Sequence, residues 1–127
     1  MNVTAMLRIA LAAMAASISL ASSAAAQSYP SKIVRIIAPF PPGGLADVLA
    51  RVVGEELQKS LGQTVIVENR PGAGGNTGAN AVATAEPDGY TLLLSSAGIL
   101  SINEFLYTRM PFDPAKAFAP ITVVADM

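Results

Sequence analysis

The sequence predicts an α/β fold built on a mostly parallel sheet with flanking helices. Short β-branched and aliphatic runs alternate along the chain with segments whose apolar residues recur at helical spacing. Proline- and glycine-rich turns separate the two kinds of segment. This βαβαβα order requires crossover connections between parallel strands, which are right-handed and place helices on both faces of the sheet.

Residues 1–26 are predicted to be a signal peptide and not part of the fold. Arg8 is their only charged side chain, an apolar stretch covers residues 9–20, and Ala24-Ala25-Ala26 resembles a small-residue cleavage site. The alternative is a membrane anchor, but about 12 apolar residues fall short of the roughly 20 that span a bilayer. We therefore expect cleavage near Ala26 and Gln27, export, and no membrane span in the mature chain.

The first strand is predicted over residues 33–38, a run that is nearly all apolar. Residues 39–47, which we call the elbow, follow it. The strand ends here because Pro41 and Pro42 have a fixed φ angle, and Gly43 and Gly44 can then adopt backbone conformations that other residues rarely allow.

A helix is predicted over residues 46–60. Its apolar positions recur at helical spacing: Leu45, Leu49, Val52, Val53 and Leu57. Gly62 is expected to be its left-handed cap.

A second β-branched strand is predicted over residues 64–68, followed by the glycine loop (residues 69–76) and a helix over residues 77–85. The glycines of this region fall as G-x-G-x-x-x-G, one residue longer than the dinucleotide-binding fingerprint, and no acidic residue ends the next strand. Tight packing of the second helix is therefore a better explanation than nucleotide binding. Arg70 remains a possible surface or cleft cation.

The third strand is predicted over residues 90–94, after a type I turn at residues 86–89. The serine loop (residues 95–98) follows, and then a short helix over residues 101–108. Proline residues break the chain at 111–114, and a last strand is predicted to begin over residues 121–127.

Composition excludes several classes of chemistry. The chain has no cysteine and no histidine, so a disulfide framework, Ser-His-Asp and Cys-His catalysis and most zinc sites are not expected. Eight Lys and Arg against nine Asp and Glu give a net charge of −1 without a basic cluster, so nucleic acid is not an expected partner. We expect no metal, no cofactor and no enzymatic activity.

The elbow is the first candidate for a binding site. It lies where a helix begins, so backbone N–H groups from Gly43 to Asp47 can hold a carboxylate, with Phe40 as an apolar wall. A tight turn without a ligand remains an equal alternative. Asp47 either caps the first turn of the helix or accepts a hydrogen bond from the ligand.

The serine loop is the second candidate, because the carboxyl ends of parallel strands meet at one edge of the sheet. Ser95 and Ser96 offer hydroxyl groups, and Gly98 allows the backbone to approach a ligand closely. A plain connection between strand and helix is the alternative. Two loops at the same edge favour binding of a single ligand.

These motifs together resemble the substrate-binding proteins of tripartite tricarboxylate transporters, the Bug-type periplasmic solute receptors. The resemblance runs from Tyr29 to Ala125, and four blocks carry it: residues 39–47, 67–76, 87–92 and 111–114. Only the amino-terminal portion of such a protein is represented. The resemblance implies that residues 27–127 form an incomplete first lobe of a type II periplasmic-binding-protein-like fold, without the second lobe.

The resemblance also implies a function and a set of binding residues. Such receptors capture a small carboxylate, for example a di- or tricarboxylate, and deliver it to membrane permease subunits. The expected ligand-binding residues are Phe40, Gly43, Gly44, Leu45, Ala46, Asp47, Ser95, Ser96 and Ala97. Ala46 departs from the family, which usually has Ser or Thr there. The alternatives are a truncated product without a working ligand site and an exported α/β enzyme acting on an anionic substrate.

Overall fold

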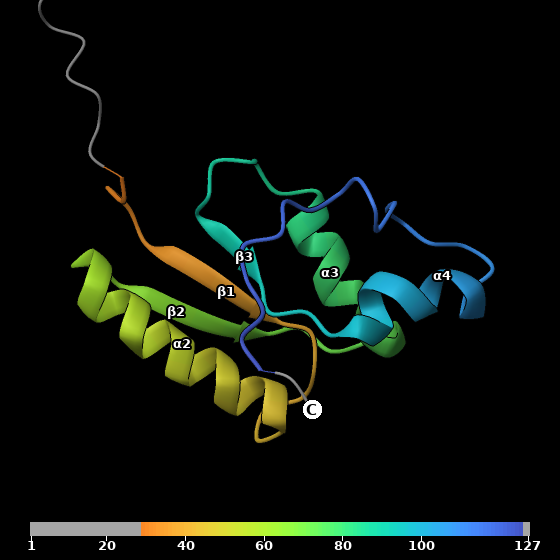
Figure 1. Cartoon of the computed structure of the whole chain (residues 1–127), viewed down its shortest axis with the longest axis horizontal. Helices are drawn as coiled ribbons and strands as arrows, with labels where there is room; N and C mark the ends of the chain where they lie inside the picture. Colours follow the sequence, from red (N-terminus) through yellow and green to blue (C-terminus); the bar gives the residue numbers. More distant parts are fainter. Residues whose placement is uncertain (1–28, 126–127) are drawn as a thin grey trace, which may run out of the picture.

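The computed structural model describes residues 29–125. Three parallel strands form its sheet: β1 (Val34–Ala38), β2 (Val65–Asn69) and β3 (Thr91–Leu93). Their order is β2-β1-β3, so β1 is the central strand (Figure 1). The prediction of an α/β fold with a parallel sheet is confirmed, and each of these strands lies within two residues of its predicted bounds. The predicted signal peptide lies outside the described residues.

Two helices cover opposite faces of the sheet. α2 (Leu45–Leu61) contributes Ala50 to one core cluster, which Leu92 and Leu94 also contact. α3 (Asn76–Ala83) contributes Ala79 to a second cluster, which Leu93 contacts. Successive side chains of a strand point to opposite faces, so the two clusters lie on opposite sides of β3. The predicted helices on both faces are therefore confirmed.

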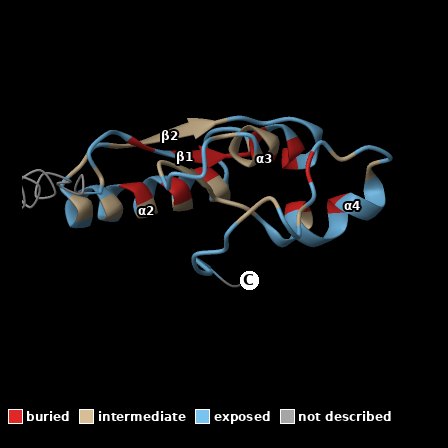
Figure 2. Cartoon of the chain, turned by 90° about the horizontal axis from the view of Figure 1, so that it is seen from above, coloured by how far each residue is buried: buried red, intermediate tan, exposed pale blue. Residues whose placement is uncertain are grey.

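The core is concentrated around the central strand. Along β1, Val34, Ile36, Ile37 and Ala38 are each at most 2% exposed, whereas Arg35 between them is exposed. Figure 2 shows the buried residues along β1 and on α2 and α3. A nearly continuous apolar run is expected for a strand with a helix on each face. The sequence pattern at residues 33–38 therefore correctly identified a strand buried on both sides.

Glycines fix both the end of α2 and the packing of α3. Gly62 adopts φ 64° and donates its N–H to the Gln58 carbonyl at 3.0 Å, which confirms the predicted left-handed cap. In the glycine loop, a short 3₁₀ turn, Ala73–Gly75 (η2), leads into α3. A Cβ at Gly78 would lie 2.8 Å from the Arg70 carbonyl oxygen. This close approach supports tight packing as the reason for the glycines.

The chain after β3 differs from the prediction in two places. The short helix predicted at 101–108 begins three residues earlier, with a wide helical turn of the π type, η3 (Gly98–Ile102). It continues as α4 (Asn103–Leu106) and ends two residues earlier than predicted. It stops because Tyr107 takes an extended conformation (φ −107°, ψ 124°).

The predicted last strand at 121–127 is wrong for residues 121–125, which pair with none of the three described strands, and residues 126–127 lie outside the described part of the chain. A strand is stabilised by its hydrogen-bonded neighbour and by burial of a face, and this segment has neither: Ile121 is 78% and Val123 80% exposed.

Candidate functional site

The two predicted binding segments leave the sheet at the same edge. The elbow follows β1, the serine loop follows β3, and the Leu94 N–H donates to the Ile37 carbonyl at 3.0 Å where the two strands end. From β1 the chain crosses to β2 on one side, and from β2 it crosses back over β1 to β3 (Figure 1). The two crossover connections therefore run in opposite directions along the sheet, and the point where the direction changes lies between β1 and β3. In open α/β sheets, ligands bind at such switch points, outside the carboxyl ends of the strands.

The elbow presents a row of backbone donors. Gly43 adopts φ +84°, a conformation that side chains rarely allow, and Gly44 is extended (φ −81°, ψ 170°) just before α2 begins. The first N–H groups of a helix have no partner within it. Among the described residues, no hydrogen bond takes up the N–H groups of Gly44, Leu45 or Ala46, and Gly44 and Leu45 are exposed. These donors and the positive end of the helix dipole suit an anion.

Asp47 is bound within the elbow from three directions. Its Oδ2 accepts a hydrogen bond from the Gly43 N–H at 2.9 Å, while its Oδ1 accepts one from Asn69 Nδ2 at 2.9 Å and pairs with the Arg51 guanidinium at 2.9 Å. The residue is only 4% exposed. The Arg51 hydrogen bond, followed by those from Gly43 and Asn69, lowers the pKa of Asp47 to about 2. The carboxylate accepts from Gly43, which precedes the N-cap Gly44, and makes no side-chain cap hydrogen bond to the helix, so its contacts hold the elbow together, and both predicted roles of Asp47 stay predictions.

The low pKa of Asp47 predicts how acid destabilises the chain. Its folded-state pKa of about 2 lies below the ordinary value of 3.8, so its contribution to stability is complete above pH 3.8 and is lost as pH falls toward 2. We expect Asp47→Asn to flatten the dependence of stability on pH between 4 and 2, measured by urea unfolding at several pH values.

Asp113→Asn is the matched control for this pH experiment. Like Asp47, Asp113 forms an ion pair, in this case with Lys116 at 2.8 Å. The Asp113 and Lys116 side chains, however, are 48% and 84% exposed. Exposed ion pairs contribute little because water screens them. An equal flattening in both variants would contradict the role given to Asp47.

The other predicted binding residues are Phe40, in the elbow, and three residues of the serine loop. Phe40 is half-buried and packs against the second core cluster, and its carbonyl oxygen accepts a hydrogen bond from Asn69 Nδ2 at 3.2 Å. Ser95 is half-buried, while Ser96 and Ala97 are exposed. The Ser96 carbonyl accepts hydrogen bonds from the Ile99 and Leu100 N–H groups at 3.1 and 3.3 Å, so the serine loop begins the next helical turn.

Asn69 and Arg51 are two residues in contact with the elbow that the sequence prediction missed. Arg51 lies one helical turn after Asp47, an i,i+4 spacing at which opposite charges pair, so the sequence carried a signal for it. Asn69 carried none, because its contacts with Phe40 and Asp47 span 29 and 22 residues of chain.

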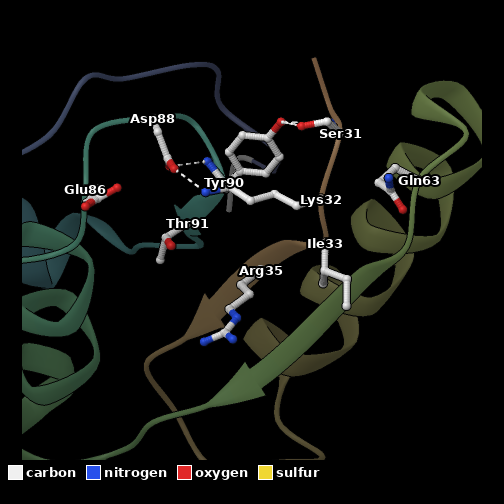
Figure 3. A pocket seen from close by; sticks show the side chains of 9 residues that line it. All are labelled: Ser31, Lys32, Ile33, Arg35, Gln63, Glu86, Asp88, Tyr90 and Thr91. Atoms are coloured by element: carbon white, nitrogen blue, oxygen red, sulfur yellow. Dashed lines mark hydrogen bonds and ion pairs between the residues drawn. The ribbon is translucent and has the colours of Figure 1, made fainter. Parts of the chain in front are cut away.

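One hollow of the structure lies away from the elbow. It measures about 630 Å³ and lies near the beginnings of the strands, where Lys32 pairs with Asp88 at 2.8 Å and the Ser31 and Tyr90 hydroxyl groups lie 3.3 Å apart (Figure 3). A second hollow, of about 240 Å³, lies beside the first turn of α3. The elbow and the serine loop line neither of these two hollows.

No group of three or more acidic, cysteine or histidine side chains within residues 29–125 is placed to hold a metal ion. Over the same part of the chain, no helix has both the length and the apolar character needed to cross a membrane.

Known proteins resemble this chain in sequence and in structure. The sequence model of one protein family, described as the tripartite tricarboxylate transporter family receptor, matches residues 49–127. Protein BugT from Bordetella pertussis is 41% identical over 128 residues, which cover 100% of this chain and 39% of that protein. MatC from Rhodopseudomonas palustris with bound malate is 38% identical, with a TM-score of 0.69 over 72% of this chain and 31% of that chain. An R. palustris protein with adipate is also 38% identical, with a TM-score of 0.66 over 68% and 29%.

The chain therefore spans between 29 and 39% of the length of these three proteins. The family resemblance predicted from residues 39–47, 67–76, 87–92 and 111–114 is confirmed. Because the family model matches more than half of its length, the chain belongs to the family of tripartite tricarboxylate transporter receptors.

Proposed function

We propose that this chain is the amino-terminal part of a periplasmic receptor that captures a small carboxylate for a tripartite transporter. The observation that carries the proposal is the row of N–H groups at Gly44, Leu45 and Ala46, which no hydrogen bond within the described residues takes up and which lie at the switch point of the sheet. Membership of the receptor family supports it, as do the similar solved structures with malate and with adipate. Residues 1–26 direct export, and residues 27–127 belong to the first lobe.

The elbow would bind a carboxylate through backbone atoms alone. Two or three hydrogen bonds to a charged group contribute about 1.5–3 kcal/mol each, and association itself costs several kcal/mol. The net free energy of binding is then at most about 4 kcal/mol, equivalent to a dissociation constant of about 1 mM or weaker. Micromolar affinity requires about 8 kcal/mol, and thus a second wall that encloses the ligand. In a receptor of the length of the relatives, the remaining part would supply this wall.

A titration of the chain with malate and with adipate tests this proposal. We expect the backbone N–H resonances of Gly44, Leu45 and Ala46 to shift in two-dimensional NMR spectra, with a dissociation constant of about 1 mM or weaker. Malamide, in which amides replace both carboxylates, is the control ligand and is expected to cause no such shifts. The proposal is wrong if neither acid shifts these resonances at 50 mM, or if the shifts concentrate at the hollow around Tyr90.

The same spectra separate a receptor from an enzyme. A receptor returns its ligand unchanged, so the ligand's own resonances should stay constant over days of incubation. New ligand resonances would favour the alternative of an exported enzyme acting on an anionic substrate.

A further inference from the structure

We propose that Asn69 and Arg51 are positioning residues of the carboxylate site, which hold the elbow in shape and cancel the charge beneath it without touching the ligand. The inference rests on the proposed function. It adds a layer of side chains behind the backbone donors and explains how a buried carboxylate can lie next to a site for an anion.

Asn69 ties both ends of the elbow to the sheet. It is the last residue of β2 and lies opposite Ala38, the last residue of β1. Its Nδ2 donates to the Phe40 carbonyl at 3.2 Å, at the start of the elbow, and to Asp47 Oδ1 at 2.9 Å, at its end. The Nδ2 group has two N–H bonds, and both are engaged. Asn69 therefore fixes the path of the intervening residues and has no donor left for a ligand.

Arg51 completes this cluster and balances its charge. Its guanidinium lies 2.9 Å from Asp47 Oδ1 and donates to Asn69 Oδ1 at 3.3 Å, so both ends of the Asn69 amide are held. Asp47 is the only charged residue of the elbow. Without Arg51, its negative charge would lie uncompensated behind the donors and would oppose a carboxylate. With Arg51, the cluster is neutral overall and the helix dipole can favour the anion.

Asn69→Ala tests the role in shape. The Gly43 N–H, which donates to Asp47 Oδ2, reports on the closed elbow through its rate of hydrogen exchange. We expect exchange at Gly43 to become about tenfold faster and the dissociation constant for malate to rise about fivefold. Asn80→Ala is the matched control, because the buried Oδ1 of Asn80 has no hydrogen-bond partner among the described residues. It should change neither quantity.

Arg51→Gln tests the role in charge. We expect it to weaken malate binding about fivefold, and Arg51→Lys to restore most of the affinity, since a lysine keeps the positive charge. Arg35→Gln is the matched control. It removes the same charge from a side chain of nearly equal exposure (55%, against 56% for Arg51), but it lies on β1 and pairs with Glu68 at 3.6 Å. It should leave malate binding unchanged.

The outcomes separate this inference from the proposed function. If the unmodified chain binds neither malate nor adipate, the proposed function fails. If it binds, but Asn69→Ala leaves Gly43 exchange and affinity unchanged, the role of Asn69 is wrong. If Arg51→Gln and Arg35→Gln weaken binding equally, or if Arg51→Lys restores nothing, Arg51 does not act through its charge at the elbow.

Discussion

Gly78→Ala is expected to lower the free energy of unfolding by about 3 kcal/mol, at the upper end for overpacking of a core position. Gly78 lies in α3, where an added Cβ would be 2.8 Å from the Arg70 carbonyl oxygen and 2.9 Å from Pro39 Cα. Both are backbone atoms, directly after β2 and β1, so relief requires α3 to move away from the carboxyl edge of the sheet. Urea unfolding followed by circular dichroism measures the loss.

Gly54→Ala is the matched control and is expected to have the opposite sign. Gly54 is also a buried helical glycine, on α2. Its added Cβ would meet only the side chains of Ile36, Val67 and Val65, at 3.5–3.6 Å, which is ordinary contact. Alanine favours the helical backbone over glycine by about 0.5–1 kcal/mol, so the variant should be slightly more stable. Equal destabilisation by both substitutions would show that the contact with the backbone is not what requires glycine at 78.

Gly44→Val is expected to abolish carboxylate binding and to leave the chain folded. The backbone of Gly44 is extended, a conformation open to any residue, and an added Cβ meets only the Pro41 carbonyl oxygen at 3.6 Å. The branched side chain would, however, occupy the space that a ligand needs to reach the N–H groups. The NMR titration with malate measures binding, and a thermal unfolding curve measures the fold. Unchanged affinity in a folded variant would rule out the backbone site.

Two companion substitutions show whether backbone or side chains bind the ligand. Leu45→Ala truncates a 53% exposed side chain and keeps its N–H, so affinity should stay the same. Ala46→Ser adds the hydroxyl that the sequence resemblance leads us to expect at this position. A single new hydrogen bond of about 0.5–1.5 kcal/mol corresponds to a two- to tenfold tighter dissociation constant. A large loss in Leu45→Ala would point to side-chain recognition.

Much of the fold could be predicted because its signals are local. The buried run that became β1, the helical spacing that became α2 and the left-handed Gly62 each depend on a few neighbouring residues. The last predicted strand failed for the opposite reason. Ile121, Thr122 and Val123 have the composition of a strand, but composition does not supply a partner, and residues 121–125 pair with no described strand.

The sequence by itself determined the order of elements, the family, and the place of the elbow at the carboxyl edge, because spacing and turn chemistry act over short stretches of chain. Only the tertiary structure decided what Asp47 does. Its carboxylate meets Asn69 because the pairing of β2 with β1 brings together residues 22 positions apart. Strand pairing likewise placed Arg70 and Pro39 where Gly78 must pack. Such contacts depend on register and on packing between elements, which no local pattern encodes.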